Sequence, residues 1–419
     1  MSAAELDLRR LIDSHQPGHA LAREFYSSPE IFERDMERIL LRHWFCAGHV
    51  GSVPRPGNFL VVDLGLESVI IVRTQEGQIK ALLNVCRHRG SRICTERSGK
   101  AAAGLLTCPY HAWSYDLNGR LVAARQMGAS FDRAQFALKG LQVRVVEGLI
   151  FTTFAEQPLS FDSTEAAMSQ SLRVHGWAEA QVAHREMYSI KANWKLAIEN
   201  YMECYHCQPA HPEYSKHHAL ARPFAQTRHL DRPARLRAEA MGIFIADVDQ
   251  YGLAAHPGSE SVSVFRSPLL EPTAEALSGA RPAPLMGDFS GFDGNSTYVD
   301  IGPLSDFLAY VDHGVIYRFI PRGALQTDME VIWLVHGAAR EGEDFDVESL
   351  TALWKTTSLQ DKAIVEWNQA GVNSRFFKPG PYSDQESYAR RFTEWYLSEL
   401  NGQDSIPGAE AGPLASHQA

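Results

Sequence analysis

The sequence predicts an α+β protein in which a helical arm precedes a small β domain and a larger domain of helices and strands. Short apolar runs separated by Gly and Asn-Gly turns fill the stretch from residue 44 to about residue 155, a pattern typical of strands. Two long helical patterns follow at residues 193–208 and 347–370, with strand patterns between them. A chain of 419 residues, 45% hydrophobic and 21% charged, is long enough for two or three domains with sizeable cores.

Residues 1–43 are expected to form the helical arm, packed against the larger domain. Charged helical patterns cover Leu6 to Ile12 and Pro29 to Leu41 in this stretch. Residues 44–160 are expected to form the β domain. Its clearest strand signals are Phe59 to Val62, Val69 to Val72, Ala81 to Leu83 and Leu149 to Phe151.

Residues 161–408 are expected to form the larger domain, which is entered through a linker around Glu156 to Thr164. Its strand signals lie at Val315 to Ile320 and Met329 to Val335. The last residues, 409–419, are mostly small and polar and are expected to be a disordered tail.

The overall composition excludes several classes of protein. The net charge is −10 and no long Lys/Arg run is present, so we expect neither nucleic acid nor an anionic membrane as a partner. No stretch of about 18 apolar residues exists, and the opening MSAAELDLRR lacks the apolar segment of a signal peptide. With six cysteines and no sign of a disulfide framework, a reduced cytoplasmic location is expected.

Two short Cys-His pairs are the most informative feature of the β domain. Cys86 and His88 form a C-x-H pair, and Cys108 and His111 form a C-x-x-H pair after 19 intervening residues. Two thiolates on one iron and two neutral imidazoles on the other are the ligands of a Rieske [2Fe–2S] cluster. The sequence therefore predicts an iron–sulfur redox centre.

Structural zinc is the alternative interpretation of these four residues. Zinc also takes two Cys and two His, but its motifs usually pair Cys with Cys and His with His. Here each pair mixes one Cys with one His, which suits one ligand to each of two irons. The run from Cys108 to Trp113 also resembles the second cluster loop of Rieske oxygenases.

A second candidate metal site lies in the pattern at residues 193–208. Asn200, Glu203, His206 and Cys207 fall at i, i+3, i+6 and i+7, so one helix face is expected to present them together. His211 is five residues beyond His206 and lies between two prolines, which would end the helix and let it fold back. Two imidazoles that meet in this way could supply two ligands of a facial triad for non-haem iron(II).

Asp361 is the favoured third ligand. It lies on the apolar stripe of the helical pattern at residues 347–370. A buried carboxylate is costly without a cation or charged partner, and a metal ion is one such partner. A salt bridge or a helix cap is the alternative.

Cys204 and Cys207 form a C-x-x-C motif on either side of His206. A redox role would need a second ligand pair or a thioredoxin-like context, and neither is present. We therefore expect two small buried residues on a helix.

The order of these features resembles the oxygenase α-subunits of the Rieske non-haem iron oxygenases. The resemblance covers nearly the whole chain. It implies a Rieske β domain, a helix-grip catalytic domain with an antiparallel sheet, and a head-to-tail homotrimer. The segments that carry it are Cys86-Arg87-His88, Cys108-Pro109-Tyr110-His111, Asn193-Trp194-Lys195, Glu199-Asn200-Tyr201-Met202-Glu203-Cys204-Tyr205-His206, His211 and Gln360-Asp361.

The resemblance also implies roles for individual residues. The [2Fe–2S] ligands would be Cys86, His88, Cys108 and His111, and the ligands of a single Fe²⁺ would be His206, His211 and Asp361. Glu203 would be the electron-transfer bridge between His206 and the cluster ligand His111 of the next subunit, with Asn200 as a supporting neighbour of the iron site. Glu at this position is similar to the carnitine enzymes, whereas ring hydroxylases usually carry Asp.

The C-terminal region from Asn368 to Ser383 resembles that of betaine-type Rieske monooxygenases, which act on glycine betaine, stachydrine and carnitine. The implied reaction is O2-dependent oxidative N-demethylation of a quaternary ammonium compound, with release of formaldehyde. Electrons would come from a separate NAD(P)H-dependent flavin or ferredoxin-type reductase, since no dinucleotide-binding glycine motif follows a strand here.

Two alternatives remain. The same metal centres could hydroxylate an aromatic ring or another carbon, or the chain could be a Rieske electron carrier. A carrier needs only the small domain, and about 260 residues lie beyond it. Aromatic faces bind quaternary ammonium ions. We expect most aromatic residues of the larger domain to be ordinary core and a few to line such a cage, which the sequence alone does not single out. The residues are Phe244, Tyr251, Phe265, Phe289, Phe292, Tyr298, Phe307, Tyr310, Tyr317, Phe319 and Trp333.

Overall fold

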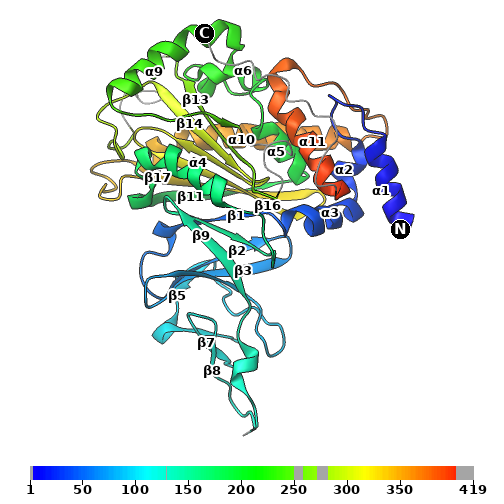
Figure 1. The fold of residues 1–419 in the computed structure, drawn as a ribbon, viewed down its shortest axis with the longest axis vertical. Helices are drawn as coiled ribbons and strands as arrows, with labels where there is room; N and C mark the ends of the chain where they lie inside the picture. Colours follow the sequence, from blue (N-terminus) through cyan, green and yellow to red (C-terminus); the bar gives the residue numbers. More distant parts are fainter. Residues whose placement is uncertain (1–2, 129, 250–257, 271–281, 403–419) are drawn as a thin grey trace.

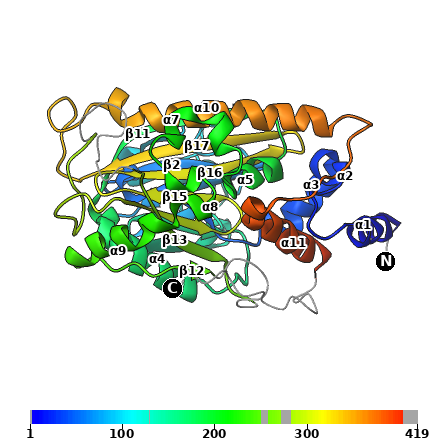
Figure 2. The same ribbon diagram turned by 90° about the horizontal axis from the view of Figure 1, so that it is seen from above.

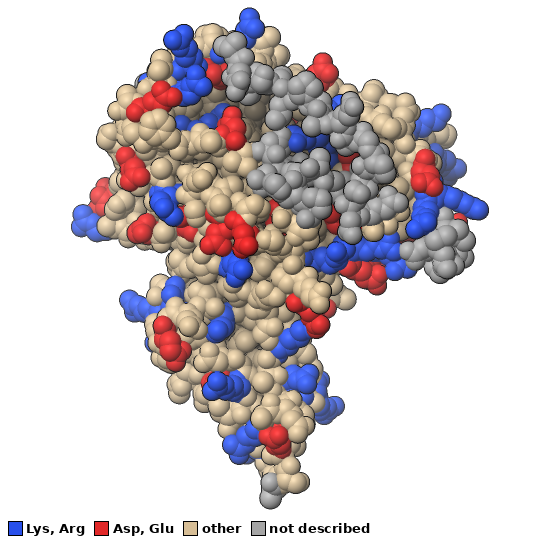
Figure 3. All heavy atoms as spheres, viewed as in Figure 1, with Lys and Arg blue, Asp and Glu red and all other residues tan. Residues whose placement is uncertain are grey.

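The computed structural model describes residues 3–128, 130–249, 258–270 and 282–402. A narrow β domain, blue to cyan in Figure 1, joins a broader domain built on a second sheet. The predicted α+β class is confirmed. None of the described helices has the length and apolarity that a membrane crossing requires. Figure 3 shows acidic and basic side chains interspersed over one face, which offers no continuous basic surface.

The β domain contains a seven-stranded antiparallel sheet and a small three-stranded sheet. The large sheet has the order β1-β10-β9-β4-β3-β2-β5 and the small one β6-β7-β8. Between β4 and β5, and between β6 and β7, the chain forms the two loops that carry the Cys-His pairs. The strands are β1 (Phe45–His49), β2 (Asn58–Leu64), β3 (Glu67–Arg73), β4 (Ile79–Leu83), β5 (Ser98–Lys100), β6 (Leu105–Thr107), β7 (Ser114–Asp116), β8 (Leu121–Ala123), β9 (Gly140–Val146) and β10 (Leu149–Thr153).

The larger domain is built on a seven-stranded antiparallel sheet with the order β11-β17-β16-β15-β14-β13-β12. Long apolar and β-branched runs favour these strands, and the strands predicted near residues 315 and 329 are confirmed as β16 and β17. The strands are β11 (Gln181–Ile190), β12 (Val248–Asp249), β13 (Val262–Pro268), β14 (Asn295–Ile301), β15 (Ser305–Ala309), β16 (Gly314–Gly323) and β17 (Gln326–Val335).

Helices cover both faces of this sheet. One face packs against α5 and α10, and the other against α4, which contacts β13 and β14. Figure 2 shows α10 running the length of the sheet, as the long pattern at residues 347–370 predicts. The helices of this domain are α4 (Asp162–Leu172), α5 (Trp194–Tyr201), α6 (Cys207–Ala210), α7 (Pro212–Ser215), α8 (Phe224–Thr227), α9 (Asp231–Ala240), α10 (Val347–Val372) and α11 (Ser387–Asn401).

Strand alternation divides the side chains of the sheet between two cores. Val315, Tyr317 and Phe319 of β16 face α5 and α10, whereas Ile316 faces the opposite core with Phe307. We call the first of these surfaces the helix-covered face. It carries most of the aromatic side chains that surround the candidate iron site.

The N-terminal arm packs against the larger domain through a buried ion pair. The arm comprises α1 (Ala3–Asp13), α2 (Arg23–Ser27), α3 (Pro29–Asp35) and a π-helical turn, Met36–Leu40. Asp35 is fully buried beside Lys195 of α5, and it accepts hydrogen bonds from Trp194 Nε1 (2.9 Å) and the Tyr396 hydroxyl (2.7 Å). One carboxylate thereby joins the arm, α5 and α11.

The helix predicted at residues 193–208 is only partly correct. The helix α5 ends at Tyr201, and residues 202–206 form a turn before the short α6. The carboxylate of Glu203 accepts hydrogen bonds from the backbone N–H groups of Tyr205 and His206. A side chain that binds its own backbone in this way competes with helical hydrogen bonding, so the helix stops. The predicted tail at 409–419 lies outside the described residues.

Candidate metal centres

The two Cys-His pairs lie on neighbouring loops at the free end of the β domain, near β7 in Figure 1. Cys86 and Cys108 are buried, at 3% and 2% exposure, whereas His88 and His111 are exposed. The centroids of the two imidazole rings are 4.7 Å apart. Two buried sulfurs beside two exposed imidazoles fit the ligand set of a Rieske cluster.

Residues next to the pairs hold the first loop in place. The side-chain oxygen of Asn84 accepts hydrogen bonds from the backbone N–H groups of Ile93 and Cys94, each at 2.9 Å. Trp113, from the second loop, stacks on the His88 ring with centroids 4.7 Å apart and planes 13° from parallel. The two loops therefore position each other.

The hydroxyl of Tyr115 contacts Cys86 of the first loop. Its oxygen lies 3.4 Å from Cys86 Sγ and accepts a hydrogen bond from the Arg87 backbone N–H at 3.0 Å. Because the oxygen already accepts from Arg87, its own hydrogen is available to the sulfur. Hydrogen bonds to sulfur ligands influence the reduction potential of an iron–sulfur cluster.

The donor atoms that lie closest together are not those of the Cys-His loops. Among the described residues, His206, His211 and Asp361 form one group of candidate metal ligands. Their donor atoms all lie within 4.8 Å of one another. The donors on the Cys-His loops do not form such a group.

His206, His211 and Asp361 meet beneath the middle of α10. His206 precedes α6, His211 lies between α6 and α7, and Asp361 projects from α10. Asp361 Oδ1 is 2.9 Å from His211 Nε2 and 3.4 Å from His206 Nε2. Two imidazoles and one carboxylate on one side of a point form the ligand set of a facial triad.

The outer nitrogens of both histidines are engaged by side-chain oxygens. His206 Nδ1 is 2.5 Å from Glu203 Oε1, and His211 Nδ1 is 2.8 Å from Gln360 Oε1. Asn200 Nδ2 lies 3.3 Å from His206 Nε2. Acceptors on both Nδ1 atoms favour the tautomers whose Nε2 atoms can bind a metal.

The charges in this cluster compensate one another. Burial alone would lower the pKa of His206, but hydrogen bonds to Asp361 and Glu203 raise it to about 9. Burial alone would raise the pKa of Asp361, but His206 and His211 outweigh burial and lower it. The buried carboxylate thus depends on positive charge, which a divalent metal can supply in place of an imidazole proton.

Glu203 and Asn200 lie beside His206, but not on the common helix face that the sequence pattern predicts. Asn200 is in the last turn of α5, and Glu203 is in the turn that follows. Asn200 and Glu203 still contact His206, because the turn after α5 folds His206 back towards both side chains.

The C-x-x-C motif also differs from the prediction. Cys204 and Cys207 are joined by a disulfide, with Cα atoms 4.8 Å apart. The expectation of two small buried residues on one helix is therefore wrong, because the turn between α5 and α6 brings the two sulfurs together. His206 lies within the loop that the disulfide closes.

Aromatic side chains form what we call the aromatic wall, between the helix-covered face and the iron site. The hydroxyls of Tyr214 and Tyr298 are 2.9 Å apart, and the Tyr201 ring is 5.0 Å from that of Tyr317. The ring centroids of Trp354 and Tyr214 are 6.0 Å apart. The wall consists of Tyr201, Tyr214, Tyr298, Tyr310, Tyr317 and Trp354.

Three of the six residues of this wall are among the eleven aromatic residues that the sequence offers, most of which were expected to be core. Tyr298, Tyr310 and Tyr317 were candidates, whereas Tyr201, Tyr214 and Trp354 were missed. Tyr201 and Tyr214 could have been found, because each lies within five residues of a predicted ligand. Among the other candidates, Phe244 is largely exposed, Phe307 faces the opposite core, Phe289 belongs to a separate cluster and Tyr251 lies outside the described residues.

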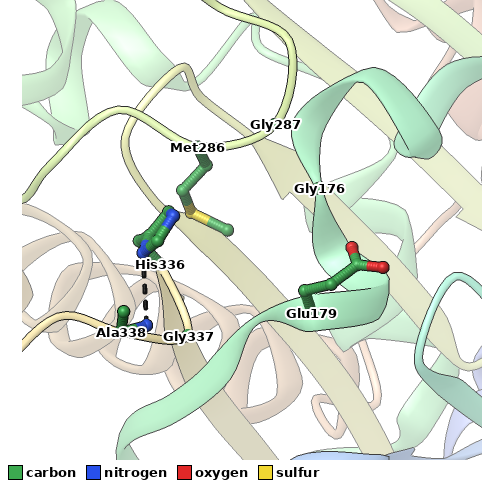
Figure 4. Close-up of a pocket in the computed structure, with 7 residues that line it drawn as sticks. All are labelled: Gly176, Glu179, Met286, Gly287, His336, Gly337 and Ala338. Carbon is green, nitrogen blue, oxygen red and sulfur yellow. Dashed lines mark hydrogen bonds between the residues drawn. The ribbon is translucent and has the colours of Figure 1, made fainter.

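A separate cavity of about 430 Å³ contains none of these residues. Figure 4 shows Glu179, Met286 and His336 on its walls. His336 Nδ1 accepts a hydrogen bond from the Ala338 backbone N–H at 3.2 Å, which is a local turn contact. This cavity has neither the triad nor the aromatic wall.

Comparisons with known proteins agree with this geometry. The Rieske [2Fe–2S] domain family matches residues 43–143, and the catalytic domain family of ring hydroxylating alpha subunits matches residues 177–402. The glycine betaine monooxygenase oxygenase subunit of Chromohalobacter salexigens is 35% identical, over 96% of this chain and 92% of the relative. The carnitine monooxygenase oxygenase subunit of Escherichia coli is 30% identical, over 48% of this chain and 54% of the relative.

Solved structures share the fold. The quaternary ammonium Rieske monooxygenase CntA, in complex with L-carnitine, has a TM-score of 0.68 and 21% identity, covering 94% of this chain and 98% of CntA. Naphthalene 1,2-dioxygenase with indole bound has a TM-score of 0.66 and 17% identity, covering 91% of this chain and 92% of the other. With both family matches and a relative similar along nearly its whole length, the chain belongs to the Rieske non-haem iron oxygenases, as a catalytic α-subunit that uses a [2Fe–2S] cluster and a mononuclear iron.

Proposed function

We propose that this protein is the oxygenase component of a monooxygenase that removes an N-methyl group from a betaine-type quaternary ammonium compound. The observation that carries the proposal is the 35% identity to a glycine betaine monooxygenase oxygenase subunit over 96% of this chain. The aromatic wall beside the triad supports it, because a quaternary ammonium has no N–H to donate and is bound by ring faces.

The proposed ligands divide between the two domains. For the cluster they are Cys86, His88, Cys108 and His111, and for the iron His206, His211 and Asp361. Iron(II) held by three protein ligands keeps open positions and supplies O2-dependent oxidation of a nearby C–H bond. Glu203 and Gln360 would fix the orientation of the two imidazoles through their Nδ1 atoms.

The protein's part in the reaction is to position one methyl group and to keep water out. The aromatic wall is mostly buried and would hold the cationic head of the substrate against the triad. Hydroxylation of the methyl carbon gives a hemiaminal. Cleavage of its C–N bond then yields formaldehyde and the demethylated amine.

Electrons would reach this site from another copy of the chain in a head-to-tail homotrimer. Within one chain, the loops near β7 and the region of α6 lie at opposite ends of the molecule in Figure 1, which supports transfer between subunits. Glu203 would bridge His206 and the cluster ligand His111 of the partner subunit. A separate NAD(P)H-dependent reductase of the flavin or ferredoxin type would supply the electrons.

Formaldehyde release tests this function. The iron-loaded protein, a compatible reductase and NAD(P)H would be incubated with a panel of betaines and aromatic acids. We expect formaldehyde in proportion to consumption of one betaine. A hydroxylated aromatic product without formaldehyde would instead favour carbon hydroxylation. Protein that binds a cluster but no further iron, and forms no product, would indicate an electron carrier.

A further inference from the structure

Two carboxyl groups face each other across neighbouring strands on the helix-covered face. Asp300 of β14 and Asp306 of β15 are directly opposite in the antiparallel register, so their side chains lie on the same surface. Tyr317 of β16 is opposite Asp306 in turn. Because Tyr317 belongs to the aromatic wall, the carboxyl pair lies on the same side of the sheet as the iron site.

Among the described residues, neither carboxyl group forms an ion pair with a basic side chain. Asp306 is 6% exposed, and its Oδ2 atom is buried without a hydrogen-bond partner among the described residues. Burial raises the pKa of Asp306 well above its ordinary value, and the neighbouring Asp300 raises it further through its charge and a hydrogen bond between the two side chains. Such a buried pair holds a proton in place of a compensating charge, and a cation beside it would favour the ionised form.

A second unsatisfied polar atom lies on the same surface. The Ser263 hydroxyl is buried, at 1% exposure, and has no hydrogen-bond partner among the described residues, whereas the Tyr201 hydroxyl interacts with Ser358. Ser263 of β13 is opposite Asp300 in the register, and the Tyr201 ring is 5.0 Å from that of Tyr317. Buried polar groups in proteins are nearly always satisfied, so a cluster of unsatisfied ones indicates a place for a ligand or water.

Tyr201 connects this space to the candidate iron site. Burial raises the pKa of its hydroxyl well above the ordinary value, and the carboxylates of Asp361 and Asp306 add to the rise. Tyr201 therefore lies near both the proposed iron ligand and the carboxyl pair. A group bound beside Asp306 would lie on the same side of the sheet as the proposed iron ligands.

We propose that Asp300 and Asp306, with the rings of Tyr201 and Tyr317, form the subsite that binds the positively charged head of the substrate. The ligand class is a quaternary ammonium ion. This inference rests on the proposed function and assigns the residues that would select a cation over an uncharged group of the same shape.

The charge and shape of this surface fit such a head. A trimethylammonium group cannot donate a hydrogen bond, so it gains from nearby negative charge and from aromatic faces. Because a bound cation favours the ionised form of the pair and an ionised pair repels a carboxylate, the pair also sets the direction in which a zwitterionic betaine can enter. The substrate's carboxylate would point away from β14 and β15.

A comparison of two ligands of the same shape tests the subsite. Glycine betaine and 3,3-dimethylbutanoate differ only by nitrogen against carbon, so one has the positive charge and the other lacks it. We would measure both affinities by calorimetry on the iron-loaded protein without O2. If glycine betaine does not release formaldehyde, the betaine that does would be compared with its own carbon isostere. In Asp306→Asn we expect the preference for the cation to fall about tenfold or more, with little change in affinity for the isostere.

Asp300→Asn is a second variant in case Asp306→Asn folds poorly, and it should also reduce the preference. Asp328→Asn is the matched control, because Asp328 lies on the same sheet but pairs with Arg322 instead. An unchanged preference in Asp300→Asn and Asp306→Asn would overturn the subsite and leave the proposed function intact. A wild-type protein that neither binds a quaternary ammonium nor releases formaldehyde would overturn both.

Discussion

The Oε1 atom of Glu203 lies 2.5 Å from Nδ1 of His206, whose Nε2 atom lies 3.4 Å from Asp361 Oδ1. One carboxylate therefore orients an imidazole whose other nitrogen is turned towards the remaining donors of the iron site. The carboxylate of Glu203 is itself held in place by hydrogen bonds from the backbone N–H groups of Tyr205 and His206. This position suits a residue that acts through His206 rather than by binding the metal.

Replacing Glu203 by Ala should reduce turnover about 10- to 100-fold while both metal centres stay loaded. The reason is that electron transfer would lose its connection at His206, whereas the three iron ligands would all remain. Iron content, the visible spectrum of the cluster and steady-state formaldehyde release are the measurements. Glu203→Gln keeps an oxygen near Nδ1 and should retain more activity. Full activity of Glu203→Ala with both metals bound would contradict a role of Glu203 in electron transfer.

Replacing Asp361 by Ala should remove the mononuclear iron and leave the cluster in place. Asp361 is the only carboxylate in the close donor set of the described residues, whereas the cluster loops lie in the other domain. Iron analysis should show one iron fewer per chain, with the visible spectrum of the cluster unchanged. Loss of the cluster instead would mean that Asp361 supports the fold rather than the iron.

The Tyr115→Phe variant should have a lower cluster potential than the wild type. The Tyr115 hydroxyl is 3.4 Å from Cys86 Sγ, and a donor to sulfur stabilises the reduced, more negative cluster. We expect a decrease on the order of tens of millivolts, measured by spectroscopic titration. Tyr110→Phe is a suitable control, because Tyr110 is exposed and stacks on His111 through its ring. Equal potentials in all three proteins would exclude this role for Tyr115.

Local sequence pattern was sufficient to propose the metal ligands and to predict the longest elements. The Cys86–His88 and Cys108–His111 spacings are set within single loops, and the apolar stripe around Asp361 repeats along one helix. These signals do not depend on contacts between distant parts of the chain. The predictions of α10, β16 and β17 are correct for the same reason.

Features that depend on distant contacts or on a single side chain were not predictable. The turn at Glu203 follows from a carboxylate binding its own backbone, which the helical period does not reveal. The disulfide between Cys204 and Cys207 depends on that turn. The pairing of Asp300 with Asp306 depends on strand register, because a shift of one residue would turn one of them to the opposite face.

Replacing Lys195 by Met should cost about 3–5 kcal/mol of the free energy of unfolding. Lys195 and Asp35 are both fully buried, so the variant would leave an uncompensated carboxylate between the arm, α5 and α11. Urea denaturation measures the change. Lys139→Met is the matched control, because Lys139 pairs with Glu156 in largely exposed positions and should contribute less than about 1 kcal/mol. Similar losses in both variants would contradict a special contribution from the buried pair.

The carboxyl pair should also make the stability of the fold depend on pH. Burial raises the pKa of Asp300 to about 7, and that of Asp306 is raised as well. A carboxyl group whose pKa is higher in the folded state binds its proton more tightly there, so its contribution to stability is present at low pH. That contribution is lost as the pH rises from about 4 through about 7. Tyr201 and Tyr317 face the pair from α5 and β16, and since burial raises the pKa of both, neither ionises in this window.

Asp306→Asn should therefore gain stability relative to the wild type as the pH rises. We expect the difference in free energy of unfolding to shift in favour of the variant by about 1–2 kcal/mol between about pH 5 and about pH 8. Urea denaturation at both pH values measures it, with Asp328→Asn as the control on the same sheet. Parallel pH profiles of Asp306→Asn and the wild type would mean that the pair titrates normally. We expect Asp306→Asn to be more stable than the wild type at high pH and also to have a weaker preference for the cation. Both results together would mean that the wild-type pair lowers stability in favour of substrate binding.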